Sequence, residues 1–125
     1  MTFIGLSRRA ILDLKEIEEY SVERWGKTTA EEYLGSIEQG LNRLRENPGL
    51  LRARKDISPH FSLYRVREHF LVCAVNAGRI YVLTIKHGSM DLPERLAELE
   101  PHLMQEAELL QRTLERKGGK KGGRP

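Results

Sequence analysis

The stretch that decides the fold runs from Ile80 to Pro93 and reads IYVLTIKHGSMDLP. Its first half is rich in β-branched and aromatic residues, which predicts a strand. Its second half is a short polar turn with Lys86, His87 and Asp91, and Pro93 then opens a helix. A strong strand signal coincides here with a cluster of ionisable side chains, so the junction is the first candidate for a functional site.

Two further strands precede this one, at 61–67 and 69–76, and the decisive strand itself spans 79–87. The connections are short, and Gly78 supplies the positive φ that tight hairpin turns require, so the three strands predict an antiparallel meander. The middle strand is apolar on both faces and should be central. Residues 2–6 predict a short N-terminal strand, and residues 50–59, which lack periodicity, predict a loop.

Two amphipathic helices lie between the N-terminal strand and the meander. In the first, Ala10, Leu14, Ile17 and Trp25 recur at helical spacing, with Ser7 as N-cap and Gly26 at the end. The second is expected to start from a cap at Thr28 or Thr29 and to stop at 47–49, Asn-Pro-Gly. Its apolar stripe is Ala30, Tyr33, Leu34, Ile37, Leu41 and Leu44. So short a connection predicts an antiparallel helical hairpin.

A last helical pattern follows Pro93, with apolar residues at Leu96, Leu99, Leu103, Ala107, Leu110 and Leu114. Pro101 interrupts this pattern, which predicts helix to Glu100, a break or kink, and a second helix to about Lys117. The stripe is longer than a small sheet can cover, so an exposed remainder would imply self-association or a partner. The chain is therefore predicted to be α+β: an N-terminal strand, a helical hairpin packed on a small antiparallel β-sheet, and a C-terminal helix.

The net charge of +3 is concentrated at the C-terminal end. Without the four basic residues of 117–125, 17 basic residues face 18 acidic ones, so residues 1–116 carry a net charge of −1. The Gly/Lys tail is too polar to bury surface and is expected to be disordered. Cys73 is the only cysteine, which excludes an intramolecular disulfide. The sequence shows neither a signal segment nor a membrane-spanning run, so we expect a cytoplasmic protein.

Chemistry at the junction has two interpretations. His87 could act as a general acid or base, with Arg65 and Arg67 of the neighbouring hairpin stabilising a phosphate. Alternatively, His87 hydrogen-bonds the turn and Asp91 caps the following helix. The remaining histidines, His60, His69 and His102, have no metal-ligand spacing, and we expect neither a metal nor a cofactor. Trp25 either fills the space under the helical turn or is exposed as a partner anchor.

Three segments together resemble the RelE/ParE superfamily of type II toxins, and specifically its ParE-like branch. They are 6–17, LSRRAILDLKEI, with Tyr20 and ERWG at 23–26; LRENP at 44–48; and IKHGSMDL at 85–92. The resemblance implies a ParE-like toxin domain over 1–96. Residues 97–125 have no clear counterpart in the family; their pattern and composition predict a C-terminal helical extension over 97–116 and a disordered basic tail over 117–125. The resemblance also implies a helical hairpin on an antiparallel sheet, as the periodicity predicts independently.

The resemblance further implies a bacterial toxin that inhibits growth by binding DNA gyrase, without chemistry of its own. A cognate ParD-like ribbon-helix-helix antitoxin is implied as a partner, with operator DNA reached only through that antitoxin. On this reading His87, Met90, Asp91 and Leu92 bind the target, and Trp25 and Tyr33 face the antitoxin. Ser89 departs from the family, which often has a basic residue there.

Two alternatives stay open. The first is a RelE-like, ribosome-dependent mRNA endonuclease that uses His87 with Arg65 and Arg67; the acidic balance of residues 1–116 and the absence of a dense lysine set count against it. The second is a family member that has lost toxicity and only sequesters an antitoxin.

Overall fold

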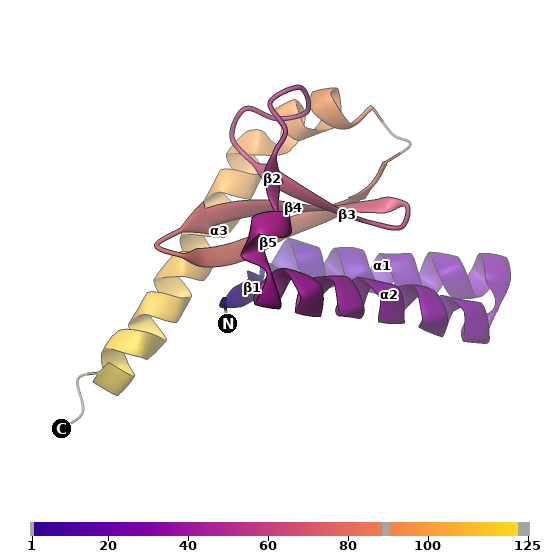
Figure 1. Ribbon diagram of the computed structural model, residues 1–125, viewed down its shortest axis with the longest axis horizontal. Coiled ribbons are helices and arrows are strands. Elements are labelled where there is room, and N and C mark those ends of the chain that lie inside the picture. The colour runs from indigo at the N-terminus through magenta and orange to yellow at the C-terminus, as the bar shows by residue number, and fades with distance from the viewer. Residues whose placement is uncertain (1, 89–90, 123–125) are drawn as a thin grey trace.

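The structure is a computed structural model that describes residues 2–88 and 91–122, with side chains described as far as Glu115. Its elements in chain order are β1 (Ile4–Leu6), α1 (Arg8–Trp25), α2 (Lys27–Glu46), the 3-10 turn η1 (Pro48–Leu50), β2 (Arg52–Ala53), β3 (Ser62–Val66), β4 (His69–Asn76), β5 (Arg79–His87) and α3 (Leu92–Gly122). Figure 1 shows the α1–α2 hairpin on one side of the sheet and α3 on the other. The α+β prediction is confirmed.

The five strands form one sheet in the order β1-β5-β4-β3-β2. The predicted meander is confirmed, since β3, β4 and β5 pair antiparallel in sequence order. The prediction of an antiparallel sheet is wrong for one pair of strands: β1 pairs parallel with β5, with Ile4 opposite Ile80. The long stretch of chain from α1 to β4 that separates β1 from β5 allows this parallel pairing. The loop predicted at 50–59 begins at the last residue of η1 and contains the two-residue strand β2, which pairs with β3.

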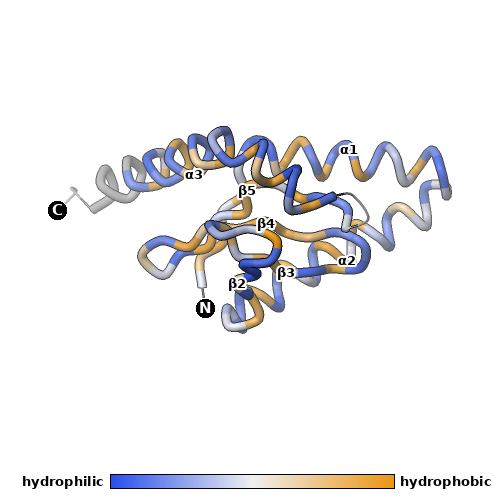
Figure 2. Tube along the Cα trace, turned by 90° about the horizontal axis from the view of Figure 1, so that it is seen from above, coloured by the Kyte–Doolittle hydropathy of each residue, from blue (hydrophilic) through white to orange (hydrophobic). Residues whose placement is uncertain are grey.

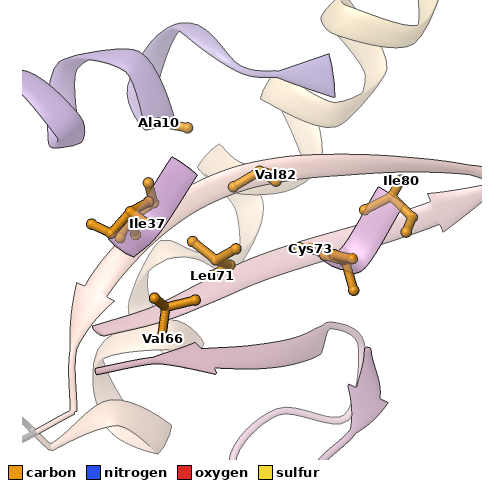
Figure 3. Close-up of a cluster of buried hydrophobic side chains, with 9 residues drawn as sticks. Ala10, Ile37, Val66, Leu71, Cys73, Ile80 and Val82 are labelled. Carbon is orange, nitrogen blue, oxygen red and sulfur yellow. The ribbon is translucent and has the colours of Figure 1, made fainter. Parts of the chain in front are cut away.

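Two apolar layers cover the two faces of the sheet. On the hairpin face, Ala10, Ile37 and Leu44 pack against Leu71, Cys73 and Val82, as Figure 3 shows for most of them. On the opposite face, Leu92, Leu96 and Leu103 of α3 pack against Leu63, Val72, Tyr81 and Leu83. The middle strand β4 contributes to both layers, as its two apolar faces predicted. Burial in these two layers is the main apolar stabilisation of the fold.

Gly26 is the single residue between α1 and α2. It is the C-cap of α1 and the N-cap of α2, at φ 91° and ψ 166°, which glycine adopts without a side-chain clash. The predicted Thr28 or Thr29 cap is therefore wrong: α2 begins at Lys27 without a side-chain cap. The other predicted caps are confirmed, because the Ser7 hydroxyl accepts a hydrogen bond from the N–H of Ala10 and α2 ends at Asn47.

α3 is one helix with Pro101 in its interior, so the prediction of two separate helices is wrong, while a kink within one helix is compatible with the structure. Pro101 removes one backbone hydrogen bond, but leucines on both sides of it pack on the sheet and outweigh that loss. The stripe of α3 is covered as far as Leu114, which lies partly buried against the sheet layer. The helix extends into the segment 117–125, whose predicted disorder stays untested.

Candidate functional site

A cavity of about 830 Å³ opens between the α1–α2 hairpin and the end of the sheet where β3 and β5 end and β4 begins. It is lined by helical residues of α1 and α2 and by residues at the strand ends: Asp13, Glu16, Ile17, Tyr20, Ser21, Arg24, Trp25, Tyr33, Arg65, Glu68, His69, Ile85, Lys86, His87 and Gly88. Four predicted site residues, Trp25, Tyr33, Arg65 and His87, therefore share one cavity.

A β-bulge turns His87 into this cavity. The pairing of β5 with β4 shifts by one residue between Val72 and Cys73. Before the shift, Ile80 and Val82 face the hairpin; after it, Ile85 lies in the same layer. Side chains alternate along a strand, so the shift also turns His87 toward the hairpin, directly opposite His69. The two imidazole rings lie 5.1 Å apart between centroids.

Asp13 of α1 holds the strand in place after the bulge. Its carboxylate is 7% exposed and accepts hydrogen bonds from the Thr84 hydroxyl and, at 3.0 Å, from the backbone N–H of Ile85. A buried carboxylate needs such donors to offset its loss of hydration. Asp13 therefore links the first helix to the strand that carries His87.

His69 and Tyr33 form the inner wall of the cavity. The Tyr33 hydroxyl lies 2.6 Å from Nδ1 of His69 and accepts the backbone N–H of Glu68 at 3.2 Å. Burial, with the nearby His87 as a second cause, lowers the pKa of His69 to about 4. The neutral ring accepts the Tyr33 proton at Nδ1, and burial raises the pKa of Tyr33 so that this proton stays in place.

Arg65 and Arg67 are both engaged at the turn between β3 and β4. Arg65 donates to the carbonyl of Arg67 at 2.8 Å and to Glu68 Oε1 at 3.0 Å. Arg67 has φ 54°, and its guanidinium lies 5.6 Å from the centre of the Tyr33 ring. The two arginines thus brace the turn that carries His69.

Trp25 is 51% exposed at the end of α1, so it does not fill the space under the helical turn. Its ring packs edge-to-face on Tyr20, which is 57% exposed, with centroids 5.9 Å apart. This exposed aromatic pair forms the outer wall of the cavity. This exposure agrees with the partner-anchor interpretation.

The residues predicted to bind the target, His87, Met90, Asp91 and Leu92, do not share one environment in the described part of the structure. His87 lies in the cavity, whereas Met90 lies outside the described residues. Asp91 precedes α3, and its carbonyl accepts the N–H of Arg95; contact with Asp91 raises the pKa of Glu94. Leu92 is 4% exposed within the α3-face layer, so it anchors the helix start and offers little surface to a partner.

The sequence prediction missed His69 and Glu68. His69 was set aside for its lack of metal spacing, yet it lies opposite His87 across the meander. Regular pairing outward from Asn76 and Arg79 places Lys86 opposite His69; only the bulge places His87 there.

Among the described residues, no three His, Cys, Asp or Glu side chains are grouped to hold a metal. No described helix is long and apolar enough to span a bilayer.

Comparison with known proteins gives one consistent result. The chain is 32% identical over 99 residues to the toxin ParE of Escherichia coli, which covers 78% of this chain and 96% of the relative. It is 33% identical over 92 residues to the toxin ParE1 of Mycobacterium tuberculosis, covering 73% and 94%. A solved structure titled as a chromosomal ParDE toxin–antitoxin system from P. aeruginosa shares the fold, with a TM-score of 0.61 at 19% identity over 70% of this chain and 96% of that one.

The family sequence model for the ParE toxin of the type II toxin–antitoxin system parDE matches residues 4–92. That range contains the helical hairpin, the whole sheet and every residue that lines the cavity. It ends at the first residue of α3. With this match and relatives above 30% identity, the chain belongs to the ParE toxin family of type II toxin–antitoxin systems.

Proposed function

We propose that this ParE toxin inhibits DNA gyrase by binding it, and that a cognate ParD-like, ribbon-helix-helix antitoxin neutralises the toxin. Membership of the family supports the toxin role and an antitoxin partner. The target itself is an inference from the ParE-like resemblance of the strand-to-helix junction.

One observation favours binding over catalysis: several polar groups at the sheet end of the cavity are engaged with one another. His69 is neutral and accepts the Tyr33 hydroxyl, and Arg65 and Arg67 brace the neighbouring turn. Groups engaged in this way shape a surface more readily than they move protons.

A second candidate, an mRNA endonuclease, is favoured by one specific feature. His87 and Arg65 line the same cavity, and Arg67 adjoins it through Tyr33. An imidazole beside arginines is an arrangement suited to phosphoryl transfer. The experiment must therefore separate gyrase inhibition from RNA cleavage.

The antitoxin is proposed to contact the hairpin side of the cavity through Trp25 and Tyr33. Exposed tryptophan and tyrosine side chains are the residues most often found at binding hot spots. The target is proposed to contact the junction at His87, Met90 and Asp91, with Leu92 holding the start of α3 behind them.

Controlled expression in a bacterial host tests both parts. We expect expression of the full chain to stop DNA synthesis before protein synthesis, measured by thymidine and methionine incorporation. Co-expression of the adjoining small reading frame should restore growth. Trp25→Ala should keep the toxicity and weaken the rescue. An early stop in protein synthesis would instead support the endonuclease, and unimpaired growth would support an inactive family member that sequesters antitoxin.

A further inference from the structure

Five arginines gather along β3 and β2, at the edge of the sheet opposite β1. We call this set the basic edge: Arg43, Arg52, Arg54, Arg65 and Arg67. Arg52 pairs with Leu63 in β2, and Arg43 reaches across from α2 to the Tyr64 hydroxyl at 3.2 Å. Arg52, Arg54 and Arg65 line one hollow of about 280 Å³ beside β3. Figure 2 shows β2 and the chain beside it as strongly hydrophilic.

The near-neutral balance of residues 1–116 hides this local charge. In the described part of the chain, two of the five arginines pair with carboxylates, Arg54 with Asp56 and Arg65 with Glu68. The edge therefore keeps a net charge of +3. Elsewhere in 1–116, 12 basic residues face 16 acidic ones. The charge is segregated, with positive charge on one sheet edge and an excess of negative charge elsewhere.

Neutral partners orient several of these arginines. Arg43 donates to a tyrosine hydroxyl, Arg65 lies 5.5 Å from the centre of the Phe70 ring, and Arg67 lies 5.6 Å from that of Tyr33. A contact with a neutral group restricts the side chain without cancelling its charge. Such arginines lose less conformational entropy when they bind an anion.

The geometry points to duplex DNA as the occupant: we propose that the basic edge docks on its phosphate backbone without reading base sequence. Guanidinium forks match phosphate oxygens. Phe70 and Tyr33 are covered by guanidinium groups, which disfavours the base stacking that single-stranded ligands need.

This inference goes beyond the proposed function, because the contact needs neither gyrase nor antitoxin. The test measures anisotropy of a labelled duplex of about 20 random base pairs against the full chain at several salt concentrations. We expect Arg43→Gln with Arg52→Gln to reduce the magnitude of the slope of log affinity against log salt by about two. The double variant Arg43→Lys with Arg52→Lys keeps the charge and should restore most of the slope.

Two matched variants serve as controls. Arg95→Gln with Arg112→Gln removes the same charge from α3, where both arginines already pair with glutamates, and should leave the slope nearly unchanged. A tail variant combines Lys117→Gln, Lys120→Gln and Lys121→Gln and so removes charge from the C-terminal tail. In this background the edge variant should still reduce the salt-dependence slope by the same amount. The proposal is overturned if the α3 variant loses as much affinity as the edge variant, if the tail variant abolishes binding, or if single-stranded DNA of equal length binds more tightly.

Discussion

At the scale of single residues, the surroundings of His69 hold its ring in the neutral form. It accepts the Tyr33 proton at Nδ1 and faces His87 across the sheet. Glu68 and Asp13 lie close enough to favour its charged form, yet burial and His87 outweigh them. Protonation of His69 would remove the acceptor of the Tyr33 proton.

This arrangement predicts a pH-dependent stability. The folded pKa of His69, about 4, lies below the unfolded value of 6.5, so the unfolded chain takes up the proton first and stability falls as pH drops from 6.5 to 4. The shift corresponds to at most about 3 kcal/mol, and about 2 kcal/mol after allowance for a half-buried ring. Urea unfolding of wild type and His69→Gln at pH 7 and 4.5 measures it. The prediction would be contradicted if both proteins lost the same free energy of unfolding between pH 7 and pH 4.5.

Asp13 offers a second test at the residue scale. Asp13→Ala leaves the Thr84 hydroxyl and the Ile85 N–H without an acceptor, and we expect a loss of about 3 kcal/mol in the free energy of unfolding. Thr84→Val removes one donor only and should cost about 1 kcal/mol. Chemical denaturation gives both values. A smaller effect for Asp13→Ala than for Thr84→Val would show that Asp13 does not hold the strand.

At the scale of elements, the helix–sheet contact depends on a missing side chain in α2. A Cβ added at Gly40 would lie 2.5 Å from Cγ2 of Val66 in β3, whereas a Cβ at Gly35 would meet nothing within 4 Å. The glycine therefore allows α2 to approach β3 closely. This approach also places Arg43 beside Tyr64.

The two glycines form a matched pair. Gly40→Ala should destabilise the protein by about 2 kcal/mol through overpacking, although alanine favours the helix. Gly35→Ala should stabilise it by roughly 0.5–1 kcal/mol. Thermal or urea unfolding gives the sign of each change. Gly40→Ala combined with Val66→Ala tests the contact itself, because the combined loss should be smaller than the sum of the two single losses.

Elements whose signals are local could be predicted from the sequence. The stripes of α1 and α2, the Ser7 cap and the turn at Gly78 depend on neighbours within a few residues, and the structure confirms them except at Trp25, the exposed last residue of the α1 stripe. The parallel pairing of β1 and the bulge in β5 depend on residues far apart in the chain. The His69–His87 pair depends on that bulge, so no spacing rule could have found it.

At the scale of the whole molecule, the sheet is enclosed by helices on both faces, and one of them lies beyond the family match. Residues 4–92 match the ParE family, yet the α3-face layer needs Leu96 and Leu103, which are 1% and 0% exposed. An ion pair between Arg8 and Glu106, at 2.9 Å, also links α3 to α1. The extension is therefore part of the fold.

Neighbouring residues of α3 test this integration. Leu103→Ala should lower the free energy of unfolding by about 3 kcal/mol, because it opens a cavity against the sheet. Met104→Ala, at a position that is 51% exposed, should change it by less than about 0.5 kcal/mol. Urea denaturation compares them directly. Similar small effects at both positions would mean that α3 packs loosely and that the sheet is stable without it.

On the proposed function, the molecule acts by binding gyrase and performs no chemistry of its own. One tube containing purified gyrase, relaxed plasmid, ATP, translating ribosomes and a labelled mRNA, titrated with the full chain, tests it most directly. A gyrase-binding toxin should abolish supercoiling while the mRNA stays intact. Cleavage of the mRNA with supercoiling unaffected would contradict it.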